Sequence, residues 1–121
     1  MFLQALAELR DACRCDAPDE LAILLIIQRT LVALRDPENN TDRNCKAIDL
    51  FVMLDILYPD PPATELPENF PPRVREILEA MGGELHDTHS APHVAEDFRA
   101  TPDQLLEQTQ AALARVRAER A

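Results

Sequence analysis

The stretch from His86 to Asp97 holds all three histidines of the chain among several carboxylates, and its residue types are those of a metal site. Imidazole and carboxylate together are typical ligands of zinc and of non-haem iron. His89, His93 and Asp97 would share one helix face because they are four residues apart. Pro92 opposes a helix there, however, and the HExxH pattern is absent. We therefore predict a polar loop and no cofactor, with His86, His89, His93 and Asp97 as the candidate ligands of the alternative.

Catalysis is poorly supported elsewhere in the sequence. Ser90 lies beside His89 and Asp87, but residues adjacent in one loop rarely reach the geometry of a catalytic triad. With two glycines in the whole chain, neither a GxSxG motif nor a glycine-rich phosphate loop is present. The cysteines lack an obvious fourth ligand for zinc, so buried or unreactive thiols are expected at Cys13, Cys15 and Cys45. We predict a protein without enzymatic activity.

The charge of the chain limits its partners. There are 22 acidic residues against 12 Lys and Arg, which gives a net charge of −10. An acidic surface repels the phosphates of nucleic acids, and the few basic residues do not suit binding to a membrane surface. No basic segment precedes the first apolar residues, as a secretion signal would require, so a cytoplasmic protein is expected. The partner that this charge favours is a protein with a basic face.

The segment from Leu21 to Leu34 is the element that organises the fold. Its first seven residues, Leu21 to Ile27, are all apolar, and a helix of that composition has to be buried on several sides. At about 21 Å long, it is shorter than the roughly 30 Å core of a bilayer. We predict the central helix of an all-α bundle of about five helices, spanning about residues 18–35 of a single domain over 1–121. Asp16 is its expected N-cap.

The other helices of this bundle are expected over 1–14, 42–58, 72–81 and from 101 onward. Thr101 and Gln104, with proline between them, have the pattern of a capping box. Six of the ten prolines fall within 59–72, which predicts an extended strap anchored by Leu66 and Phe70. Gly82 and Gly83 should end the preceding helix in a left-handed conformation.

One polar contact is predicted inside the bundle. A short loop around position 39 joins the second and third helices and should make them antiparallel neighbours, with Arg29 level with Asp49. Both lie within apolar runs, so we expect them to meet as a structural ion pair that fixes register. The alternative is an acid–base site.

Three functions follow from these observations. Residues 59–104 contain ten acidic and three basic residues, a surplus that favours an inhibitor of the bacterial immunity-protein or antitoxin type, which masks a basic partner. The first alternative is a structural or regulatory subunit that forms homodimers or docks through an apolar face of the first or last helix. The second is a metal-dependent enzyme that uses residues 86–97. For the inhibitor, the expected contact residues are Glu65, Glu68, Glu76, Glu79, Glu84 and Asp87.

Overall fold

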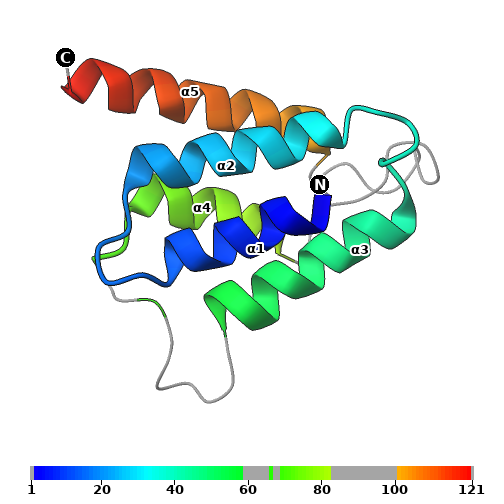
Figure 1. Ribbon diagram of the computed structural model, residues 1–121. Helices are drawn as coiled ribbons and strands as arrows, with labels where there is room; N and C mark the ends of the chain where they lie inside the picture. The colour runs from blue at the N-terminus through cyan, green and yellow to red at the C-terminus, as the bar shows by residue number, and fades with distance from the viewer. Residues whose placement is uncertain (1, 59–65, 67–68, 83–100, 121) are drawn as a thin grey trace.

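The computed structural model describes residues 2–58, 66, 69–82 and 101–120, and all regular structure in these residues is helical. Helices far apart in the sequence lie side by side and share one apolar core (Figure 1). The prediction of an all-α bundle is therefore confirmed. The elements are α1 (Phe2–Cys13), α2 (Glu20–Ala33), α3 (Asp42–Phe51), the π-helix η1 (Val52–Leu57), α4 (Pro72–Met81) and α5 (Pro102–Arg120).

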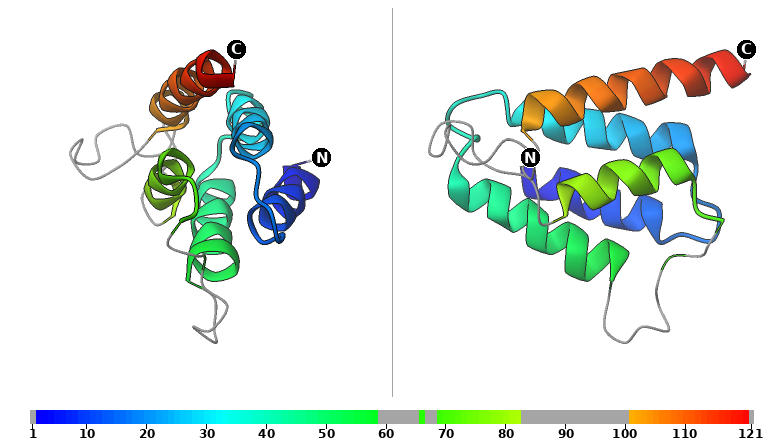
Figure 2. Two further views of the ribbon diagram at one scale, coloured as in Figure 1. Left: turned by 90° about the vertical axis from the view of Figure 1, so that its left-hand side faces the viewer. Right: turned by 180° about the vertical axis from the view of Figure 1, so that it is seen from behind.

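Helix α2 contacts three other helices of the bundle. It packs most extensively on α5 and α1 and also contacts α4, and Figure 2 shows it below α5 and beside α4. Ile23, Leu24 and Ile27 are fully buried, but Leu25 is 40% exposed and Val32 is 46% exposed. The apolar run therefore covers more of the helix than the bundle buries, and one side of α2 faces solvent.

The N-cap of α2 differs from the sequence prediction. The carboxylate of Asp19, three residues beyond Asp16, accepts a hydrogen bond of 2.9 Å from the backbone N–H of Ala22. The helix accordingly begins at Glu20, and Pro18 precedes the cap instead of lying in the first turn. The prediction of Asp16 as the cap was wrong. The side chain of an N-cap reaches the N–H of the third helical residue, here Ala22, and Asp19 stands at that spacing.

The loop between α2 and α3 satisfies its own polar groups. Thr41 caps α3 by accepting from the N–H of Asn44 at 3.1 Å, as Ser and Thr commonly do. The amide of Asn39 donates to the carbonyl of Ala33, and the amide of Asn44 donates to that of Asn39. These bonds give the carbonyl of Ala33, which also accepts from the N–H of Asp36, a second donor, and they fix where α3 begins.

The predicted helix over 42–58 changes its hydrogen bonding part-way. From Val52 the chain is π-helical, and the N–H of Tyr58 donates to the carbonyl of Met53, five residues earlier, at 2.8 Å. A π-helix has a wider turn than an α-helix, so residues four apart lie nearly above one another. η1 packs on α1 and α4, and the guanidinium of Arg14 joins α1 to it by donating to the carbonyl of Ile56 at 2.9 Å.

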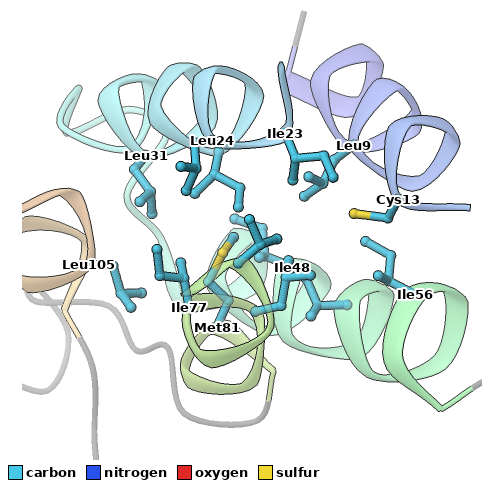
Figure 3. Packing of buried hydrophobic residues seen from close by; sticks show 14 of the residues in the cluster. Leu9, Cys13, Ile23, Leu24, Leu31, Ile48, Ile56, Ile77, Met81 and Leu105 are labelled. Carbon is cyan, nitrogen blue, oxygen red and sulfur yellow. The ribbon is translucent and has the colours of Figure 1, made fainter. Parts of the chain in front are cut away.

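Helix α4 has the predicted bounds, but Gly82 does not end it in a left-handed conformation. Its φ of −80° and ψ of 109° are extended. A Cβ at this position would lie 2.8 Å from Sδ of Met53, closer than packed atoms approach. A larger residue at this position would therefore require the Met53 side chain to move, where α4 and η1 pack together and their side chains meet in the core (Figure 3).

Helix α5 begins as its local signal predicts, and the two expected anchors of the strap are buried. The N–H of Thr101 donates to Oε1 of Gln104 at 3.0 Å, and the N–H of Gln104 donates to Oγ1 of Thr101 at 3.2 Å. This reciprocal pair is the predicted capping box. Leu66 and Phe70, the expected anchors of the strap, are 8% and 2% exposed and belong to the core. Residues 59–65, 67 and 68 of the predicted strap lie outside the described residues.

Candidate functional site

The predicted acidic contact residues fall partly on α4. Glu76 and Glu79 are both exposed there. Glu79 forms an ion pair of 3.4 Å with Arg75, one turn earlier on the same helix. Glu65, Glu68, Glu84 and Asp87 lie outside the described residues. The structure therefore describes two of the predicted contact residues, Glu76 and Glu79. Both lie on the exposed side of α4, and Arg75 lies beside Glu79.

A shallow groove between α4 and α5 includes Glu76 and has a volume of about 170 Å³. The guanidinium of Arg73 at one side already binds two carboxylates, those of Glu20 and Glu119. Charges of both signs line the groove, so it favours neither an anion nor a cation. The lining residues are Arg73, Glu76, Ile77, Gln108, Ala111, Ala112 and Arg115.

Arg73 joins three helices at one end of the bundle. Its guanidinium donates to Glu20 of α2 at 2.9 and 3.1 Å and to Glu119 of α5 at 2.9 and 2.7 Å. Beside it, Arg120 donates to Asp19 at 2.7 Å. An arginine that forms bidentate hydrogen bonds with a carboxylate fixes both the distance between the two side chains and their relative orientation. These contacts hold the C-terminal turn of α5 against the N-termini of α2 and α4.

The same contacts lower the pKa of two carboxylates at this end of the bundle. The hydrogen bond from Arg73 lowers the pKa of Glu119. The hydrogen bond from Arg120 and that from the N–H of Ala22 lower the pKa of Asp19. A carboxylate whose pKa is lower in the folded protein stabilises the fold above its unfolded pKa, and that contribution is lost as pH falls through the folded pKa.

We therefore expect acid to weaken this end of the bundle below about pH 4. Glu119→Gln should lower the melting temperature at pH 6, and the difference from the wild type should vanish near pH 2. The effect should be modest because Glu119 is 61% exposed and water screens the pair. Thermal melts followed by circular dichroism across pH 2 to 7 would measure it. Glu107→Gln, an exposed change on the same helix, is the control, and an equal effect there would contradict the assignment.

Arg29 has a partner other than the predicted one. It forms an ion pair with Glu8 of α1, and its side chain is 57% exposed. Asp49 lies on α3 and is 9% exposed, and the described residues contain no ion pair between Arg29 and Asp49. Helix α2 packs chiefly on α5 and α1. The ion pair with Glu8 shows that the side chain of Arg29 lies next to α1. An exposed pair of this kind contributes little to stability.

The predicted metal ligands and triad residues, from His86 to Asp97, lie outside the described residues. Within the described part of the chain, no group of three His, Cys, Asp or Glu side chains could hold a metal ion. Cys13 and Cys45 are buried and Cys15 is exposed. Burial raises the pKa of Cys13 to about 12, so this thiol stays protonated at neutral pH.

The surface that sequence reasoning missed is a row of apolar side chains on α3 and η1. Leu50 and Leu54 are each 60% exposed, and Tyr58 is 44% exposed. We call these three residues the apolar row. The high apolar content of residues 42–58 is typical of a heavily buried helix, yet the core takes only the opposite face, including Ile48, Val52 and Ile56. The spacing of four between members of the row was the available signal, but spacing does not say which face has a neighbour.

The prediction of an apolar docking face on the first or last helix is not supported by the packing. In α5 the apolar stripe, including Leu105 and Leu113, is buried, and α5 packs on α2. In α1, Leu6 and Leu9 are buried in the same core. Among the residues whose side chains the structure describes, the large exposed apolar ones lie on α2, on α3 and along η1 up to Tyr58.

Comparison with known proteins gave no relative. No protein-family model matches the chain, and no curated protein or solved structure matches it.

Among the described residues, no helix has both the length and the apolar character that crossing a membrane requires.

Proposed function

We propose that this protein acts by binding another protein and not by catalysis, as a small acidic cytoplasmic inhibitor of the immunity-protein or antitoxin type. The observation that carries the proposal is the state of its charges. The net charge is −10, and many of its arginines are already engaged in ion pairs with its own carboxylates. The engaged arginines are Arg10, Arg29, Arg35, Arg73, Arg75 and Arg120.

Because these arginines are engaged, the charged groups that remain for a partner are mainly carboxylates. Exposed acidic residues such as Glu38, Glu76 and Glu107 form no ion pair within the described residues. Complementary charge accelerates encounter with a basic partner and selects against acidic ones. Glu76 and Glu79 are the described members of the proposed contact, and Glu65, Glu68, Glu84 and Asp87 complete it.

The test is the salt dependence of a purified complex. The partner would be captured from the native host, identified by mass spectrometry and purified for calorimetry. We expect the affinity to fall at least about tenfold as salt rises from about 50 to about 300 mM, because salt screens exposed charges. The variant Glu76→Gln/Glu79→Gln should weaken binding more than the control Glu107→Gln. An affinity that does not respond to salt would exclude recognition by the acidic surface.

A second function is favoured by the apolar row. Isolated exposed leucines are normal, but neighbouring apolar side chains on one helix face indicate a docking surface. The protein would then be a structural or regulatory subunit that binds through α3 and η1. The metal-dependent enzyme is the third proposal, and elemental analysis of protein purified without a histidine tag tests it directly.

A further inference from the structure

The apolar row continues toward the N-terminus of α3 through smaller and charged exposed residues. Ala47 lies three residues before Leu50, and Arg43 lies four residues before Ala47. Both are exposed. At the other end η1 brings Leu54 and Tyr58 nearly above Leu50, because of its wider turn. π-helical turns occur frequently at functional sites. Together these residues form one straight surface along the helix.

We propose that this surface is the interface between two copies of the chain, with the two α3–η1 helices packed antiparallel. The proposal rests on the second function above, docking through an apolar face, and names its partner. A two-fold interface requires a surface that complements itself. The residues along α3 and η1 meet that requirement.

Side-chain size is complementary in this arrangement. Two antiparallel helices centred between Leu50 and Phe51 place Ala47 of one copy level with Leu54 of the other. A small side chain then faces a large one, as close packing requires. At the ends, Arg43 lies level with Tyr58, where a guanidinium can pack on the aromatic ring. Leu50 of each copy lies near the two-fold axis.

Charge complementarity sets the direction. Arg43 is exposed near the N-terminus of α3, and Asp55 is exposed near the C-terminus of η1. An antiparallel pair brings Arg43 of each copy level with Tyr58 of the other, within about one helical turn of Asp55 along the helix axis. A parallel pair would place Arg43 beside Arg43 and Asp55 beside Asp55, which like charges disfavour. The antiparallel pair also opposes the two helix dipoles favourably.

The dimer should be weak. One pair of helices is a small interface, and two chains of net charge −10 repel each other at long range. We therefore expect a dissociation constant on the order of micromolar. Salt screens the long-range repulsion, so about 300 mM salt should not dissociate the dimer, in contrast to the acidic inhibitor complex.

Sedimentation equilibrium of the full chain between about 1 and about 300 µM tests the interface. The wild type should pass from monomer to dimer. Leu54→Glu should raise the dissociation constant at least about tenfold, whereas Leu25→Glu, an exposed leucine of α2, should leave it unchanged. Circular dichroism of each variant confirms folding. A wild type that stays monomeric throughout, or equal effects at Leu25 and Leu54, would overturn the proposal.

A charge exchange tests the antiparallel direction. Arg43→Glu and Asp55→Arg should each weaken the dimer, because each places like charges together. An equimolar mixture of the two variants should restore the wild-type dissociation constant, since every contact between the two chains then joins opposite charges. A mixture as weak as the single variants would overturn the antiparallel arrangement. A monomeric wild type that still binds a host protein through Leu54 would overturn self-association and leave the docking function standing.

Discussion

Replacement of Leu24 by alanine should lower the free energy of unfolding by about 3–5 kcal/mol. Leu24 is fully buried on α2 and points into the core (Figure 3). Its truncation removes apolar contacts and leaves a cavity that the surrounding helices can only partly fill, because α2 is fixed on several sides by α1, α4 and α5. Urea unfolding followed by circular dichroism at 222 nm would measure the loss.

Leu25→Ala is the matched control for this change. Leu25 is the next residue of the same helix and is 40% exposed. It loses the same atoms, but they are already partly exposed to water and leave no enclosed cavity, so the loss should stay below about 1 kcal/mol. Alanine also has the highest helix propensity, which offsets part of that loss. If both substitutions destabilised the protein equally, the orientation of α2 would be wrong.

Phe70→Ala should also be strongly destabilising, by about 3–5 kcal/mol. Phe70 is 2% exposed and joins the core just before Pro71 and Pro72 begin α4. Truncation would remove the largest anchor of this segment and the apolar contacts that fix the start of the helix. Thermal and urea unfolding would report the loss as a lower midpoint.

Asn69→Ala separates this anchoring from a change in the local turn. Asn69 is the preceding residue and is exposed. Its replacement should change the stability by no more than about 0.5 kcal/mol, as for most surface positions. A small effect at Phe70, comparable with that at Asn69, would show that the segment does not depend on the core.

The two candidate surfaces of the protein make different demands on a partner. The carboxylates on α4 are exposed, and only that of Glu79 is partly balanced by an arginine of the same helix, Arg75, so they can add specificity and speed of association. The apolar row offers buried area, which provides the larger share of binding free energy in most interfaces. One protein could therefore use α4 for a basic partner and α3–η1 for its own second copy.

Local signals predicted the helix boundaries well wherever the stabilising contact lies within a few residues. Thr101 and Gln104 bond to each other, and α4 begins at the Pro71-Pro72 pair without a side-chain cap. The cap of α2 was misplaced because Asp16 and Asp19 are both capping residues and the sequence does not rank them. Gly82 was predicted to adopt a left-handed conformation, but its backbone is extended, and the atoms nearest to a Cβ at this position belong to Met53 of another helix.

The sequence by itself determined that this chain forms helices with a large apolar surface and an acidic exterior, because composition and periodicity are properties of each segment alone. Only the tertiary structure decided that Arg29 pairs with Glu8, that Leu25 faces solvent, and that Leu50 and Leu54 stay uncovered. Helix α2 and the α3–η1 helix have more apolar surface than their neighbours bury. Which part is covered depends on the packing of segments distant in the chain, and the apolar row is the surface that this packing leaves for a partner.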